Sequence, residues 1–303
     1  MVFQVMPIGY LFSLQKRWKL FAAQYDLQAF PVKPVHLALY VQHLAKSSAS
    51  ISPIDTAIYS IRWAHSLADI SPSPTDSSIV KLAVEGSRRS LAKPKSPKEP
   101  VSSSDLAQLV ADKGGQDASA FDLRLLFICL VAFAGMLRCD ELISVRMRDL
   151  SFFHDHMALY VPRRKNDKYR QGHTVFIARS GNPTCPVAMS ERYITMLGIS
   201  DKPSHPLVCG FKRTKRHGLK PTSKPLSYTT VRDIIVNGLS SYKDPSTLGT
   251  HSLRAGGASE AASSFVNERC IARQGGWKST SSKDMYIKDS ISSKLSVTRA
   301  MNL

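Results

Sequence analysis

The segment AKPKSPKEPVSSSD at residues 92–105 divides the chain, and this division limits the folds that the sequence can adopt. Its prolines, lysines and serines prevent a packed core and favour an extended tether. The chain has 303 residues, which is enough for two ordinary domains with a core each. We therefore predict a first domain at residues 1–91, a linker at 92–105 and a second domain at 106–303.

The first domain shows the spacing of helices. Large apolar residues recur every three to four positions in four stretches, at residues 13–25, 36–45, 54–65 and 77–91. Prolines separate these stretches. The pattern predicts a small four-helix domain whose aromatic stripe, with Trp18, belongs to the core rather than to a base-stacking surface.

The second domain combines helices with a small hairpin. Its longest apolar run, residues 125–137, is too short to cross a bilayer and is typical of a buried core helix. Alternating strand residues flank a turn at 165–172 and predict a β-hairpin. Other helices are expected at 106–113, 139–150, 186–197, 229–239 and from 250 onward, with a basic loop at 212–220. The predicted fold class is mainly α with a small β-hairpin or sheet (α+β).

The charge balance indicates the class of partner. Lys and Arg number 41 against 23 Asp and Glu, which gives a net charge of +18. Such a chain is suited to a polyanion, and without a membrane or export signal nucleic acid is the better partner. The five cysteines include no C-x-x-C pair, which indicates reduced thiols in an intracellular, reducing compartment.

Four residues form the start of a candidate site. His251 and Arg254 lie three apart, so on a helix they share a face and reach one ligand. The first turn of a helix also favours anions. Arg138 follows the most apolar helix, and Glu141, one turn later, can orient it. Alone, Arg138 and Glu141 would be a structural ion pair, and His251 and Arg254 ordinary surface residues.

With Lys165, Trp277 and Tyr286, the set suits attack by a phenol on a phosphodiester. The two arginines would clamp the non-bridging oxygens, and the indole N–H of Trp277 would add a hydrogen bond. His251 would assist proton movement, Lys165 would protonate the departing sugar oxygen, and Tyr286 would become joined to the phosphate. Lys168 is a rival for Lys165. The chemistry needs no metal and no cofactor, and the chain shows no carboxylate cluster for a metal.

In this order the residues resemble the tyrosine recombinase (phage integrase) family. The matching motifs are Arg138-Cys139-Asp140-Glu141-Leu142 for the family's A-R-x-x-E-L box, Lys165, His251-Ser252-Leu253-Arg254, Gly275-Gly276-Trp277 and Tyr286. Trp277 stands where many bacterial members have His. FPVKPVHLALYVQHLA, RRKNDKYRQG and THSLRAGGAS further resemble recombinases of eukaryotic mobile elements, the DIRS and Crypton types.

The resemblance implies a two-domain clamp around double-stranded DNA. Residues 1–91 would be the helical core-binding (SAM-like) domain, and 106–303 the catalytic domain. Four protomers would recombine DNA at a specific site through a 3′-phosphotyrosine, with C-terminal tails packing on neighbouring protomers. It also implies DNA integration, a mobile-element origin and, for a eukaryotic source, a nuclear location.

Two other functions remain open at this stage. The chain could be a catalytically retired, mobile-element-derived DNA-binding module, although such a remnant should have lost part of the residue set. A type IB topoisomerase shares the chemistry, but the core-binding-like domain disfavours it. The chain begins close to its first predicted helix, which leaves open that an N-terminal DNA-contacting part precedes it.

Overall fold

The structure, a computed structural model, describes residues 8–94, 98–165, 167, 169–214 and 218–301, with side chains from Lys16 onward. The chain splits into two compact units, Met1–Lys95 and Ser96–Leu303. Each unit has its own hydrophobic core. Within the described residues, no helix is long and apolar enough to span a membrane.

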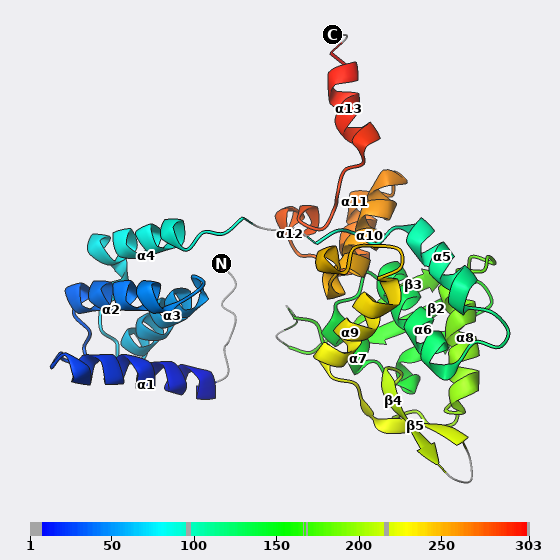
Figure 1. The fold of residues 1–303 in the computed structure, drawn as a ribbon, viewed down its shortest axis with the longest axis horizontal. Coiled ribbons are helices and arrows are strands. Elements are labelled where there is room, and N and C mark those ends of the chain that lie inside the picture. Colours follow the sequence, from blue (N-terminus) through cyan, green and yellow to red (C-terminus); the bar gives the residue numbers. More distant parts are fainter. Residues whose placement is uncertain (1–7, 95–97, 166, 168, 215–217, 302–303) are drawn as a thin grey trace. The chain divides into compact units, whose positions relative to one another are not determined.

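The first unit is a group of helices (Figure 1). Within the described residues they are α1 (Ile8–Gln24), α2 (Pro34–Ser47), α3 (Ser52–Leu67) and α4 (Ser78–Ser90), with a 3₁₀ turn η1 (Pro74–Asp76). Proline begins α2 and lies in the first turn of α3, where its missing N–H costs nothing. The predicted aromatic stripe is core: Trp18 packs edge-on against Tyr40, with ring centroids 5.3 Å apart.

His65 joins α3 to the loop that leads into α2. Its Nε2 accepts the Val32 N–H at 3.1 Å, and its Nδ1 lies 2.8 Å from the Ile61 carbonyl oxygen. The ring is buried, so both nitrogens have the partners that a buried polar group needs. His65 is therefore a structural residue, as its place in the apolar stripe predicts.

The second unit holds the remaining elements. Over its described residues the helices are α5 (Ser103–Lys113), α6 (Ala120–Ala134), α7 (Cys139–Ser144), α8 (Pro186–Leu197), α9 (Tyr228–Leu239), α10 (Thr250–Ser263), α11 (Glu268–Gly275), α12 (Thr280–Asp284) and α13 (Ile291–Arg299), with 3₁₀ turns η2 (Met147–Asp149) and η3 (Pro245–Thr247). The strands are β1 (Leu150–Phe152), β2 (His156–Val161), β3 (His173–Ala178), β4 (Cys209–Thr214) and β5 (Gly218–Pro225).

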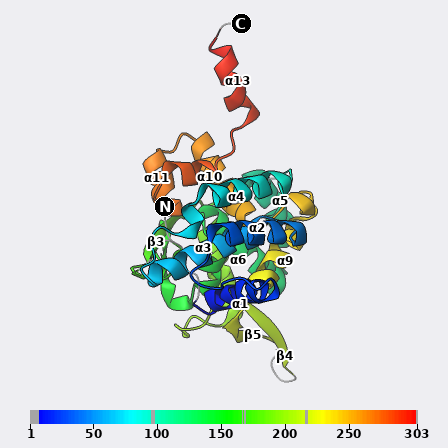
Figure 2. The same cartoon turned by 90° about the vertical axis from the view of Figure 1, so that its left-hand side faces the viewer.

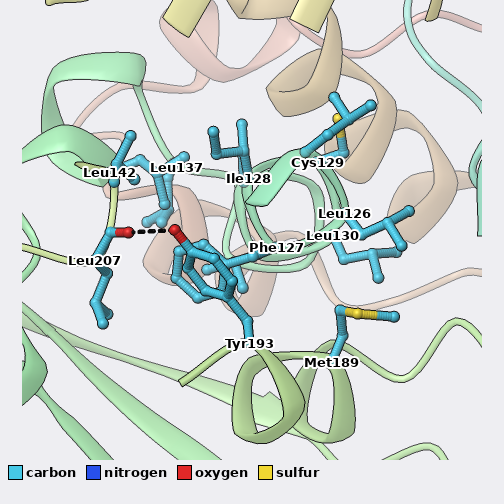
Figure 3. Packing of buried hydrophobic residues seen from close by; sticks show 14 of the residues in the cluster. Leu126, Phe127, Ile128, Cys129, Leu130, Leu137, Leu142, Met189, Tyr193 and Leu207 are labelled. Atoms are coloured by element: carbon cyan, nitrogen blue, oxygen red, sulfur yellow. Dashed lines mark hydrogen bonds between the residues drawn. The ribbon is translucent and has the colours of Figure 1, made fainter. Parts of the chain in front are cut away.

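Helix α6 is the centre of this core. Most of its side chains are buried, and α8 and α10 pack against it. Figure 3 shows Phe127 of α6 stacked on Tyr193 of α8, whose ring centroids are 5.0 Å apart. The Tyr193 hydroxyl donates to the Leu207 carbonyl at 2.9 Å, so its one polar group is satisfied.

The sheets confirm the α+β fold class and correct two details. Antiparallel β1, β2 and β3 form one sheet, and the β2–β3 hairpin is the predicted one. Residues 139–150, predicted as one helix, are only helical to Ser144, because Val145 turns extended and its carbonyl accepts the Leu207 N–H. Leu150 instead begins β1.

The predicted basic loop at 212–220 is also wrong. Residues 212–214 and 218–220 belong to a second hairpin, β4–β5, which projects from the unit in Figures 1 and 2. Arg124 of α6 holds its base: the guanidinium lies between Phe121 and Phe211 and donates to the Cys209 carbonyl at 3.0 Å. This tertiary support outweighs the weak strand propensity of lysine. Residues 215–217 lie outside the described part.

The second half of the predicted linker packs on the second unit. The Glu99 and Val101 N–H groups donate to the carbonyls of Thr247 and Ser252, at 2.9 and 3.0 Å. Val101 is fully buried. The linker also ends earlier than expected, because Ser102 caps α5 in a capping box with Asp105.

Candidate active site

Helix α10 carries His251 in its first turn and Arg254 one turn later. Gly256 and Gly257 allow this helix to approach its neighbours closely. A Cβ on Gly256 would lie 1.9 Å from the Val101 carbonyl oxygen, and one on Gly257 would lie 2.2 Å from that of Phe133. A side chain at either position would clash with these oxygens. The contacts with Phe133 place α10 against the end of α6.

Arg254 is fully buried, with 0% of its surface exposed. Its Nη1 donates to the Met136 carbonyl, and its Nη2 donates to the Gly275 carbonyl at 2.8 Å. Burial and the nearby Arg138 lower the pKa of Arg254 to about 10, so the guanidinium stays charged at neutral pH. The Arg254 Nε has no partner among the described residues.

Arg138 precedes α7 and contacts Glu141. Its Nη1 donates to Glu141 Oε1 at 2.7 Å, and its backbone N–H donates to Oε2 at 2.9 Å. Glu141 is 2% exposed, whereas Arg138 keeps 16% of its side chain accessible. Both carboxylate oxygens therefore hold Arg138 in place and leave one edge of its guanidinium open to a ligand.

Tyr286 lies beside the histidine and arginine of its own chain. Its hydroxyl is 3.3 Å from His251 Nδ1. Its ring lies 4.9 Å from Arg254 Cζ, and 5.3 Å from the Trp277 ring between centroids. Packing around the partly exposed imidazole, followed by the charges of Arg254 and Arg138, lowers the pKa of His251. His251 is therefore neutral at pH 7, and one of its ring nitrogens is free to accept a proton.

Three interactions, made by Ser259 and Lys283, hold the segment of Tyr286 in place. Ser259 of α10 donates to the Tyr286 carbonyl at 3.4 Å and accepts the Lys288 N–H at 2.8 Å. Lys283, 3% exposed, pairs with Glu268 of α11 at 2.7 Å. Neither residue was predicted from the sequence, because a serine and a lysine at these positions have no distinguishing motif.

Lys165 follows β2, at the start of the hairpin turn. Its side chain is exposed, and its charge helps to lower the pKa of His251, which places the two in the same neighbourhood. The rival Lys168 lies outside the described residues. The structure therefore shows where Lys165 is but makes no choice between the two lysines.

Trp277 closes the arrangement. Its ring is buried and lies over Arg254, with Arg254 Cζ 4.1 Å from the ring centroid. The indole Nε1 is buried and, over the described part of the chain, has no hydrogen-bond acceptor. The structure thus brings together Arg138, His251, Arg254, Trp277 and Tyr286, with Lys165 close to His251.

The end of α11 supports one further basic residue of the hairpin, Arg164, which the sequence analysis missed. Arg164 Nη2 donates to the Gln274 carbonyl at 3.3 Å. Gly275 accepts from Arg254, as described above. The last two residues of the helix, Gln274 and Gly275, therefore accept from arginine side chains, as the negative end of a helix favours.

Known structures share this fold. The chain is similar to the Tn1549 transposon integrase in complex with transposon right end DNA, at 15% identity and TM-score 0.59, covering 96% of this chain and 94% of that one. It is similar to the XerH site-specific recombinase bound to palindromic difH substrate, at 11% identity and TM-score 0.57, covering 99% and 79%. It is also similar to a lambda integrase dimer bound to a COC′ core site, at 16% identity and TM-score 0.54, covering 95% and 91%.

Sequence comparison defines the family. A search of curated protein sequences finds no match to this chain. The phage integrase family matches residues 103–292, which are more than half of the chain and include all the residues gathered around Tyr286. The chain therefore belongs to the phage integrase family, whose members are the tyrosine recombinases.

Proposed function

We propose that the protein is a site-specific tyrosine recombinase that cuts and rejoins double-stranded DNA through a 3′-phosphotyrosine. One observation carries the proposal. Of the buried side-chain N and O atoms without a hydrogen-bond partner in the described chain, four belong to this one place: Arg164 Nε and Nη1, Arg254 Nε and Trp277 Nε1. Several donors without protein acceptors at one place are suited to binding an anion, and a phosphodiester has the oxygens to accept from them.

The proposed reaction gives one role to each of five side chains. The Tyr286 oxygen attacks phosphorus, and the P–O5′ bond breaks. His251 accepts the phenol proton, and Lys165 gives a proton to the departing 5′-oxygen. Arg138 and Arg254 neutralise the charge that grows on the phosphoryl oxygens. The new P–O bond keeps the energy of the old one, so attack by a 5′-hydroxyl restores the DNA without a cofactor.

The wider assembly belongs to the same proposal. Residues 1–91 would act as the core-binding domain, and the protein would form a tetramer on DNA. Exposed Ile291, Leu295 and Val297 of α13 support packing of this tail on a neighbouring copy. By its finer resemblance, the protein would come from a eukaryotic mobile element of the DIRS or Crypton type and act in the nucleus.

Covalent trapping tests the proposed function directly. The protein is incubated with sheared genomic DNA from its source, denatured, and the fragments that stay joined to it are recovered and sequenced. Adducts whose ends map to defined sites are the expected result, and they also identify the substrate for the kinetic tests below. Salt-sensitive binding without any adduct would instead indicate a retired DNA-binding module.

Lys165→Ala should be rescued by a substrate whose bridging 5′-oxygen is sulfur. We expect cleavage of ordinary DNA to fall by about 100-fold or more, as for loss of a general acid. Sulfur leaves without a proton, so single-turnover cleavage of the sulfur substrate should stay near the wild-type rate. The same measurement on Lys168→Ala is the control: rescue of that variant instead would assign the proton to Lys168.

The rate of cleavage should fall only in acid. Protonated His251 has no lone pair for the Tyr286 proton, and its pKa is lowered. The rate should therefore hold through the ordinary imidazole pKa of about 6.5 and fall below it. Single-turnover cleavage between about pH 5 and 8 measures this, with His251→Gln, which cannot titrate in this range, as the control. A decline centred above the ordinary value would contradict the role of His251.

A further inference from the structure

Arg164 occupies a position beside the proposed phosphate site that none of the family motifs assigns. It follows β2 and precedes Lys165 in the hairpin turn. It is half-buried, and its Nη2 donates to the Gln274 carbonyl on the last turn of α11. The hydrogen bond is 3.3 Å long and anchors only one of the three nitrogens of the guanidinium.

The other two nitrogens of the guanidinium are buried and make no hydrogen bond to the described residues. Nε and Nη1 of Arg164 have no hydrogen-bond partner among the residues that the structure describes. A structural arginine would normally satisfy these donors with carbonyl or carboxylate oxygens. The nearby carboxylate of Glu141 is already used, because both of its oxygens accept hydrogen bonds from Arg138.

The surroundings of Arg164 disfavour its unpaired positive charge. Burial lowers the pKa of Arg164, and the charge of Arg138 lowers it further, whereas the Glu141 carboxylate raises it. Arg164 in turn helps to lower the pKa of Arg254. Three guanidinium groups therefore lie within electrostatic range of one another around a single carboxylate. Such a cluster favours the arrival of an anion that carries several acceptor oxygens.

The chain leaves a space for this side chain. Gly276 ends α11 with a φ of +66°, and a Cβ on it would lie 1.5 Å from Arg164 Nη1. Any other residue at position 276 would have to displace the guanidinium. The glycine before Trp277 thus serves the backbone turn and also makes room for Arg164.

We propose that Arg164 is a third phosphate-binding arginine, which neutralises charge on the phosphodiester beside Arg138 and Arg254. The inference rests on the proposed function, since it gives Arg164 a share of the same bound phosphate. Arg164 spans the gap between the hairpin that carries Lys165 and the turn that carries Trp277. Arg138 and Arg254 do not satisfy all the acceptor oxygens of the phosphate. The free donors of Arg164 supply the remaining hydrogen bonds.

A neutral substrate separates this role from a structural one. A methylphosphonate at the scissile position replaces one non-bridging oxygen with methyl and removes the negative charge. On ordinary DNA, Arg164→Ala should slow single-turnover adduct formation by about 100-fold relative to wild type. On the methylphosphonate the variant and the wild type should differ only a few-fold, because there is less charge to neutralise. Gly276→Ala should show the same pattern, since it displaces the guanidinium.

Arg163→Ala is the matched control, because Arg163 is the exposed neighbour on the same turn. It should cleave both substrates at the wild-type rate. Equal loss by Arg164→Ala on both substrates would overturn the inference and show a structural role, as would unchanged cleavage of ordinary DNA. If the wild-type protein forms no adduct with either substrate, the proposed function itself fails, which is a different result.

Discussion

Replacing Tyr286 with Phe is expected to abolish covalent protein–DNA adducts completely while DNA binding stays within about two-fold of wild type, because phosphate contacts dominate that binding. Only the attacking oxygen is removed. The ring can keep its place 4.9 Å from Arg254 Cζ and 5.3 Å from the Trp277 ring centroid. Denaturing gels for adducts, and salt titrations of binding on the same DNA, measure the two properties separately.

Adducts that persist in Tyr286→Phe would remove this residue from the role of nucleophile. A second test asks which chain supplies the tyrosine. Tyr286 contacts His251 and Arg254 of its own chain, so a mixture of Tyr286→Phe and Arg254→Ala proteins should form no adducts. Adducts restored by mixing would mean that the tyrosine acts on the active site of another copy.

Arg254→Ala is expected to slow adduct formation by about a thousand-fold, since it removes a buried positive charge from the phosphate site. The group is fully buried and close to both Trp277 and Tyr286, where charge interacts more strongly than in water. Single-turnover adduct formation on the trapped DNA site measures the effect. Cleavage at the wild-type rate would exclude Arg254 from the site.

The same substitution also removes structural contacts. The carbonyls of Met136 and Gly275 lose their donors, so some loss of thermal stability accompanies the loss of rate. Arg254→Lys separates the two effects, because lysine keeps the positive charge but lacks the several planar N–H donors of the guanidinium. We expect its thermal stability to lie closer to wild type and its rate to stay low. The rate is compared at a temperature where all the proteins are folded.

The helices could be predicted because apolar spacing and capping agree with the final packing. The stripe through Trp18 is core in the structure, and residues 186–197 form α8 as expected. Strand β1 and the hairpin β4–β5 were not predicted, because the contacts that end α7 and support β4 come from residues distant in sequence. The Leu207 N–H donates to the Val145 carbonyl just after α7. The Arg124 guanidinium of α6 packs on the Phe211 ring of β4. Local propensity carries no information about such partners.

The candidate site was predictable only in its motifs. Arg138, His251 and Tyr286 belong to ordered patterns that the family shares, so their sequence spacing pointed to one site. Arg164 lies in the quoted segment RRKNDKYRQG and Lys283 in no motif, but no sequence pattern gave either a role, and their burial and contacts draw attention to them. Gly276 belongs to one of the matching motifs, but its contact with Arg164 Nη1 could be known only from the structure.

The docked end of the linker has a mechanical consequence. Lys98 Nζ, the Glu99 N–H and the Val101 N–H all bond to backbone oxygens between Ser246 and Ser252, on both sides of His251. Residues 98–101 are therefore fixed to the segment that contains the first turn of α10. Residues 98–101 cannot leave this turn without breaking these bonds, so any displacement of these residues is expected to shift His251 as well.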